Sequence, residues 1–178
     1  MTARLHLFNA SSINSVEASE VQRNVESVFS CPTDWRQIRL NPEPAFDHSR
    51  GQYNSTALLA GFLNTKPPQD GKNILIVDID LFIPVLTFIF GEAQFGGSLA
   101  IVSTHRLKNE FYGMPPDPQL HTLRLTKEII HELGHTFGLY HCHQFECVMR
   151  SSTYVEEIDL KQERFCGECG KILASAIR

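Results

Sequence analysis

The sequence has no apolar run long enough to cross a membrane. Its most apolar stretch, residues 74–90, is interrupted by Asp78, Asp80 and Pro84, and it falls short of the roughly 20 residues that a membrane-spanning helix needs. We interpret this stretch as buried sheet. The first ten residues also hold too short an apolar run for a signal peptide. We therefore expect no membrane partner and a cytoplasmic location.

Clusters of basic residues, internal repeats and low-complexity segments are missing too. The chain carries 16 Lys and Arg against 20 Asp and Glu, a formal net charge of −4. This balance lacks the basic footprint of a nucleic-acid-binding surface, so we expect no nucleic-acid partner. The 178 residues are enough to bury a core but too few for two large domains. We expect a single compact domain over residues 1–178, monomeric by default.

What the sequence does contain is a dense motif of histidines. Residues 131–141 read H-E-L-G-H-T-F-G-L-Y-H, which is the pattern H-E-x-x-H-x-x-G-x-x-H. His131 and His135 are four residues apart, so on a helix they share a face and can bind one zinc ion. Gly138 lets the chain turn after the helix, so that His141 can reach the same metal.

Three histidine ligands leave one coordination position of zinc open. That position can hold a water, whose pKa the metal lowers towards roughly 7. Glu132 lies about 100° further round the helix than His131 and is left free to act as a base. This chemistry suits peptide-bond hydrolysis. Two alternatives stay open: an amphipathic helix that binds no metal, and His143 in place of His141 as the third ligand.

Four of the five cysteines follow the motif in two pairs. They are Cys142, Cys147, Cys166 and Cys169. The spacings C-x4-C and C-x2-C fit a closed tetrahedral zinc site, which is structural because no position is left for substrate. The alternatives are two disulfides or free buried thiols, although disulfides are rare in a reducing compartment. Cys31 lies far from both pairs, and we interpret it as a buried core residue.

The histidine motif, the cysteine set and Met149 together resemble the archaemetzincins, a subgroup of the metzincin zinc peptidases. The resemblance covers about residues 117–178. It implies that the four cysteines bind a second, structural zinc and that Met149 forms the Met-turn, an apolar floor beneath the catalytic metal. Some metzincins carry a tyrosine ligand two residues after this methionine. Ser151 stands there in this sequence, so we expect no tyrosine ligand.

Apolar periodicity and turn signals predict an α+β chain. Helices are predicted over residues 15–29, 55–63, 117–137 and much of 158–176, and strands over 4–8, 35–40, 73–79 and 97–103. The third helix begins at Asp117-Pro118 and is expected to pack on the sheet through the stripe Leu123, Thr126, Ile130, Leu133 and Phe137.

The resemblance also implies how these elements are arranged in space. It implies a single metzincin-like domain with a mixed twisted sheet, an active-site helix, an antiparallel edge strand that holds the substrate, and a C-terminal helix. Residues 1–138 would form the upper part, and residues 139–178 would carry the Met-turn and the cysteine site. Residues 97–103 are the expected edge strand.

We therefore expect a zinc-dependent peptidase with two zinc ions, one catalytic and one structural, acting on a peptide or protein. His131, His135 and His141 would hold the catalytic zinc, and Glu132 would activate its bound water. Removal of residues from the substrate's amino terminus is one mode that this activity could take. The alternative is a zinc-stabilised peptide-binding protein with weak or no hydrolysis. A nucleic-acid-binding zinc module is disfavoured because residues 142–169 are acidic overall.

Overall fold

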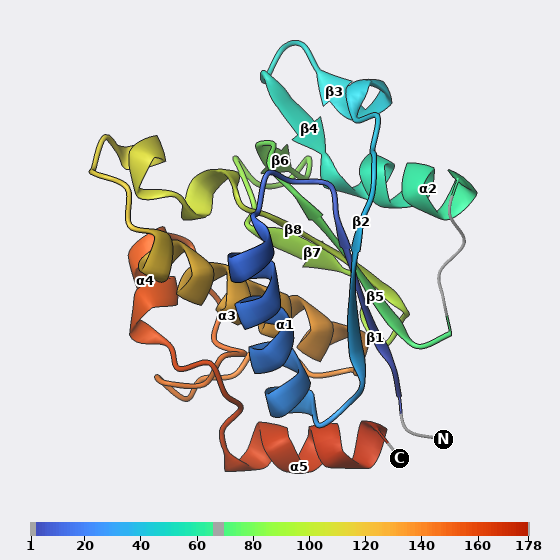
Figure 1. Ribbon diagram of the computed structural model, residues 1–178, viewed down its shortest axis with the longest axis vertical. Helices are drawn as coiled ribbons and strands as arrows, with labels where there is room; N and C mark the ends of the chain where they lie inside the picture. Colours follow the sequence, from blue (N-terminus) through green and yellow to red (C-terminus); the bar gives the residue numbers. More distant parts are fainter. Residues whose placement is uncertain (1–2, 66–69, 178) are drawn as a thin grey trace.

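The fold is built on a five-stranded sheet with the order β2-β1-β5-β8-β7 (Figure 1). The first four strands are parallel, and β7 runs antiparallel at one edge. Their bounds are β1 Leu5–Asn9, β2 Thr33–Gln37, β5 Lys72–Val77, β7 Gly91–Ala93 and β8 Leu99–Ser103. The computed structural model describes residues 3–65 and 70–177. A small sheet, β3-β4-β6, lies at one end and comprises Phe46–Asp47, Gln52–Asn54 and Leu81–Phe82.

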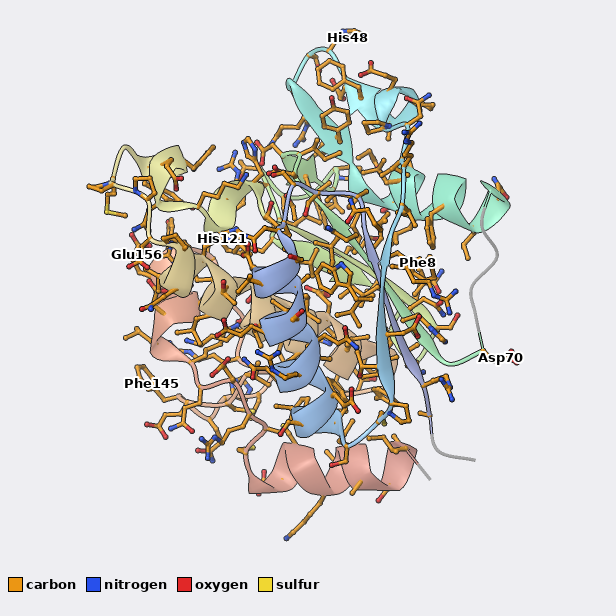
Figure 2. The ribbon with its side chains drawn as sticks, viewed as in Figure 1. Phe8, His48, Asp70, His121, Phe145 and Glu156 are labelled. Atoms are coloured by element: carbon orange, nitrogen blue, oxygen red, sulfur yellow. The ribbon has the colours of Figure 1, made fainter. Side chains whose placement is uncertain are left out.

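The five-stranded sheet is covered on both faces. Helices α1 (Ser15–Phe29) and α3 (Pro118–Thr136) pack on the face that carries Leu7, Ile74 and Val102. Helix α2 (Ser55–Thr65) packs on the opposite face, against the alternate residues of the same strands. Because neighbouring side chains of a strand point to opposite faces, the apolar runs of β5 and β8 serve both layers. Side chains fill the space between these layers (Figure 2).

Local signals set the ends of the two helices that cover one face. The Asn14 side chain accepts hydrogen bonds from the first turn of α1, and Ser30 ends that helix in the left-handed conformation. Asp117 caps α3 in the same way, with Pro118 at the first helical position. Gly138, with φ of +86°, turns the chain after α3.

The remaining helical segments are short. Three 3-10 turns cover Glu43–Ala45, His105–Leu107 and Asn109–Tyr112, and the carboxyl-terminal part holds α4 (Val155–Leu160) and α5 (Gly167–Ala176). The predicted α+β class, with its antiparallel edge strand and C-terminal helix, is confirmed. No helix in the described ranges is both long and apolar enough to cross a membrane.

The edge strand is not the one that we predicted. Residues 97–103 were expected at the edge, but β8 lies inside the sheet, parallel to β5 and antiparallel to β7. Every residue of β8 is buried, which is the pattern of a strand with neighbours on both sides. The edge is β7, whose sequence Gly-Glu-Ala is short, half-buried and carries too little apolar signal to be recognised.

Three other predictions needed correction. The helix expected over much of 158–176 is broken between α4 and α5, because residues 162 and 164 pair through their backbones with residues 146 and 148. The strand expected over 35–40 begins and ends earlier, at Thr33–Gln37. Leu123 is only half-buried, whereas Leu125 and Ile129, outside the predicted stripe, lie in the core.

Candidate active site and metal centres

Three histidines of the motif meet at the carboxyl-terminal half of α3. His131 and His135 lie one turn apart on that helix, and His141 follows the turn at Gly138. The Nε2 atoms of His131 and His135 are 3.1 Å apart, and one nitrogen of each of the three rings lies within 4.8 Å of the others. His143 is exposed and does not join this cluster.

The two helical histidines are oriented by backbone carbonyls. His131 Nδ1 lies 2.8 Å from the Val148 carbonyl oxygen, and His135 Nδ1 lies 2.7 Å from that of Leu139. An Nδ1–H donated to a carbonyl leaves the Nε2 lone pair free for a metal. Burial lowers the pKa of each of the three rings and favours the neutral form. Two nitrogens on a tetrahedral zinc lie about 3.3 Å apart, so the spacing fits this ion.

The side chain of Glu132 lies between α3, the helix that carries it, and the edge strand β7. Its side chain is buried, and that burial raises its pKa well above the ordinary range, with the Glu128 carboxylate adding to the rise. A Cβ on Gly91 of β7 would come within 2.7 Å of Glu132 Cγ and Oε1. The glycine is therefore what allows the carboxyl group to lie against the strand.

Met149 packs against α3 at Gly134, between the two helical histidines in the sequence. Its side chain is fully buried, and a Cβ on Gly134 would collide with its sulfur. Gly134 stands between His131 and His135 in the motif, at a position whose role sequence reasoning missed. The Met149 carbonyl accepts a hydrogen bond from the Cys142 amide at 2.9 Å, so the methionine turn is joined to the segment after His141.

The four cysteines form a second cluster, separate from the histidines. One sulfur of each lies within 4.8 Å of the others, and the Sγ atoms of Cys142 and Cys166 are 3.8 Å apart. Sulfurs on a tetrahedral zinc are separated by about 3.8 Å, so the spacing fits the ion. These thiols are free, as is Cys31, which is buried as predicted.

Two of these thiols show how the cluster is set up for a metal. The Cys169 amide donates to the Cys166 sulfur and, as the largest cause, lowers the pKa of Cys166 to about 7. The Cys166 amide in turn lies 3.4 Å from the Cys147 sulfur. Amides that point at sulfur favour thiolates, the form that binds zinc. At Cys147 burial is the larger influence and raises the pKa of the thiol.

A pocket of about 240 Å³ opens beside the histidines. Residues 86–91 and residues 151–153 line it, together with Glu128, His131, Glu132 and His141. Ser151, which stands where some metzincins carry tyrosine, is among the lining residues. Tyr154 is exposed at the start of α4.

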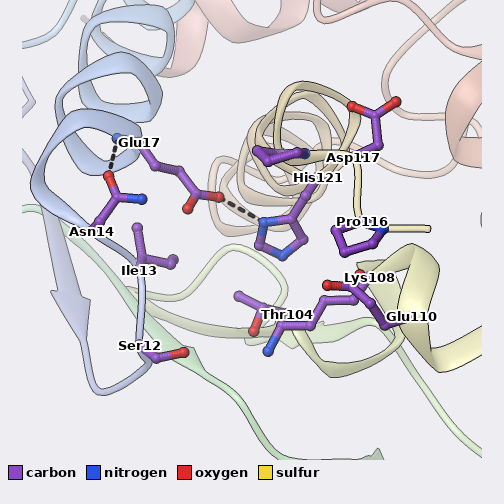
Figure 3. A pocket seen from close by; sticks show the side chains of 11 residues that line it. Ser12, Ile13, Asn14, Glu17, Thr104, Lys108, Glu110, Pro116, Asp117 and His121 are labelled. Carbon is purple, nitrogen blue, oxygen red and sulfur yellow. Dashed lines mark hydrogen bonds and ion pairs between the residues drawn. The ribbon is translucent and has the colours of Figure 1, made fainter.

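A different pocket lies away from the histidines, between the first turns of α1 and α3 (Figure 3). Its central contact joins His121 Nδ1 to a carboxylate oxygen of Glu17 at 2.7 Å. This contact joins the start of α3 to α1, so it helps to set the position of α3.

Comparison with known proteins gives the family. The model of peptidase family M54 matches residues 19–175. The chain belongs to peptidase family M54. The archaemetzincin of Methanocaldococcus jannaschii is 40% identical over 132 residues, covering 74% of this chain and 72% of that protein. The archaemetzincin of Haloquadratum walsbyi is 35% identical over 158 residues, covering 86% and 90%.

Solved structures support the same assignment. A zinc-dependent peptidase from Methanocorpusculum labreanum superposes with a TM-score of 0.85 at 32% identity, covering 95% of this chain and 99% of that one. The archaemetzincin of Methanopyrus kandleri also gives 0.85, at 33% identity, covering 98% and 95%. The resemblance inferred from the motifs is thus confirmed, and this metallopeptidase family member carries a three-histidine and a four-cysteine group able to hold zinc.

Proposed function

We propose that the chain hydrolyses peptide bonds, with a catalytic zinc on His131, His135 and His141 and a structural zinc on the four cysteines. The observation that carries this proposal is the convergence of three imidazole nitrogens beside the Glu132 carboxyl group. A zinc ion held by those nitrogens would supply a Lewis acid that polarises the scissile carbonyl and acidifies a water.

The residues of the chain have distinct parts in this reaction. Glu132 takes a proton from the attacking water and delivers it to the leaving amine. Val148 and Leu139 hold the helical histidines through their carbonyls. Met149 supplies a dry, close-packed floor under them.

The edge strand β7 offers the substrate a place to bind. Within the described part of the chain it is paired on one side only, with β8, so its other side can accept a peptide in extended form, antiparallel to β7. The Glu132 side chain lies against Gly91, the first residue of this strand. A peptide bound there would pass over the histidines with its backbone held by hydrogen bonds, largely independent of sequence.

Removal and return of the metal tests the proposal. Chelation should abolish hydrolysis of a mixed peptide library, and zinc should restore it, with metal analysis giving two zinc ions per chain. The same products show whether residues are removed from the amino terminus or bonds are cut internally. Hydrolysis that persists in metal-free protein would overturn the proposal, and tight peptide binding without cleavage would support the peptide-binding alternative instead.

A further inference from the structure

The pocket beside the histidines lies at a defined end of the edge strand. Residues 86–91 line it and lead directly into β7 at Gly91, so the pocket lies at the amino-terminal end of that strand. The opposite end leads to Gly96, whose amide donates to the His135 carbonyl at 2.9 Å. The strand therefore passes the histidine cluster with the pocket on one side only.

This placement fixes which part of a substrate faces the pocket. A peptide antiparallel to β7 has its carboxyl-terminal side over the start of the strand. His131, Glu132 and His141 are among the residues that line the pocket, so the bond to be cleaved lies beside it. The side chain that enters the pocket therefore belongs to the residue directly after the cleaved bond.

The lining of the pocket includes a buried carboxylate. Glu128 lies one helical turn before Glu132, and its side chain is only 4% exposed. Oε1 accepts a hydrogen bond from Lys161 Nζ at 3.1 Å, whereas no residue of the described chain donates to Oε2. Lys161 is fully buried, also donates to the Arg150 carbonyl and is not part of the lining.

A second unused polar group lines the same pocket. The Ser152 hydroxyl is buried and has no hydrogen-bond partner among the described residues. Buried polar groups without partners are uncommon in folded proteins, and each one calls for a ligand or a water. Glu128 Oε2 and Ser152 Oγ are both able to accept a hydrogen bond from a donor that enters the pocket.

The other lining residues indicate which kind of substrate side chain would carry such a donor. Leu86, Phe88 and Phe90 contribute apolar surface, and the charged side chains of the described lining are Glu128 and Glu132, with no lysine or arginine among them. A long apolar stem with a cationic head matches this combination.

We propose that this pocket selects lysine or arginine directly after the cleaved bond, and that Glu128 and Ser152 determine this specificity. The inference rests on the proposed peptidase function. An apolar side chain would leave the Glu128 oxygen and the Ser152 hydroxyl unpaired, and an acidic one would face two carboxylates.

Matched inhibitors test the inference without relying on turnover. Three peptidyl hydroxamates, which chelate zinc, would carry a 4-aminobutyl, an n-butyl or a 2-carboxyethyl side chain at the position that enters the pocket. Calorimetry on the zinc-loaded protein should show the aminobutyl compound binding about tenfold or more tightly than the butyl compound, with the carboxyethyl compound weakest. A tighter butyl compound, or equal affinities, would overturn the inference.

The variants are chosen so that the fold survives. Glu128→Leu/Lys161→Met removes both charges of the pair, because removing one would leave the other buried and alone. This double variant should reduce the aminobutyl preference to about one, and Ser152→Ala should reduce it in part. Glu156→Gln, which removes an exposed carboxylate outside the pocket, is the matched control and should keep the full preference.

The outcomes separate this inference from the function on which it rests. Hydroxamates that bind with equal affinity support a zinc site and contradict the specificity. An aminobutyl preference that persists in the double variant overturns the role of Glu128. Binding of none of the three to zinc-loaded protein overturns the peptidase proposal, and the specificity with it.

Discussion

Two glycines determine how closely neighbouring segments approach the motif helix. Gly134 leaves room for the Met149 sulfur, and Gly91 leaves room for the Glu132 side chain. Neither has a positive φ, so what each position requires is the absence of a Cβ. The close approach of β7 and of the methionine turn to α3 depends on these two positions.

Gly91→Ala should impair the reaction more than the fold. The new Cβ would lie 2.7 Å from Glu132 Cγ and from the Ile101 carbonyl oxygen, so either the carboxyl group or the strand must shift. We expect kcat/KM to fall at least about tenfold, since small misplacements of catalytic groups are costly, while the zinc content stays at the wild-type level. Gly61→Ala, where a Cβ meets open space, is the control. Wild-type turnover in Gly91→Ala would contradict this role.

Asp80 should make stability sensitive to acid. Burial raises its pKa, but hydrogen bonds from Arg106, at 2.6 and 2.7 Å, and from Gln52 outweigh burial, so the pKa lies below the ordinary value. A lowered folded-state pKa stabilises the fold above the unfolded pKa of about 3.9, and this contribution is lost as the pH falls through the folded value.

The measurement is the free energy of unfolding against pH for wild type and Asp80→Asn. The difference between the two should be constant above about pH 5 and shrink below about pH 4. Asp70→Asn, at an exposed position, should not reproduce this pattern. A difference independent of pH down to pH 2 would show that the Asp80 charge contributes nothing.

Residues with a fixed spacing in the sequence were the ones that could be predicted. The histidines and cysteines could be recognised because ligands of one metal recur at set intervals in the sequence. The structure brings each set together. The contact between Glu128 and Lys161 joins residues 33 positions apart. No periodicity encodes such a pair, because it depends on where the loop after α4 runs.

At the scale of elements, α3 is the structure on which the site is built. It carries two of the histidines and Glu132, and it contacts β7, β8 and α1. Its beginning is fixed by Asp117, whose Oδ1 accepts from the Leu120 amide at 2.9 Å. The start of the helix was predictable because a cap followed by proline is a local signal.

Asp117→Ala should destabilise the protein by about 1 kcal/mol, the usual cost of losing an N-cap. Because Asp117 lies four turns from the histidines along α3, kcat should be unchanged where the protein is folded. Denaturant unfolding measures the loss. Asp117→Asn, which can still cap, should recover most of it, and an alanine variant as stable as wild type would show that the cap is dispensable.

The elements that were mispredicted are those that depend on partners far away in sequence. The strand β7 has three half-buried residues and exists because β8 lies beside it. The break between α4 and α5 exists because residues 162 and 164 bond to the loop before Met149. A local pattern of apolar residues cannot report either interaction, so the wrong strand was assigned to the edge.

At the scale of the whole molecule, the cysteine cluster connects separate segments of the carboxyl-terminal part. Cys142 follows His141 directly, Cys147 precedes Met149 by two residues, and Cys166 and Cys169 belong to the start of α5. A metal on these sulfurs would hold the last helix, the methionine turn and the third histidine in one arrangement.

The double variant Cys142→Ser/Cys169→Ser tests this linkage. Zinc content should fall from two ions per chain to one, and Tm should fall because the folded state loses a bound ligand. Turnover should also fall, since the segment that carries His141 is no longer held. Metal analysis and calorimetry give the first two quantities, with Cys31→Ala as the control for loss of a thiol. An unchanged zinc count would contradict the four-cysteine site.

Peptide hydrolysis by Glu132 and a three-histidine zinc site can be checked in one experiment. A diverse peptide library is incubated with zinc-loaded wild type and with Glu132→Ala, and the products are identified by mass spectrometry. Cleavage products are expected with the wild type alone, while both proteins bind zinc equally. Equal rates in the two would contradict the assignment of Glu132 as the base, and products from neither would contradict the peptidase function.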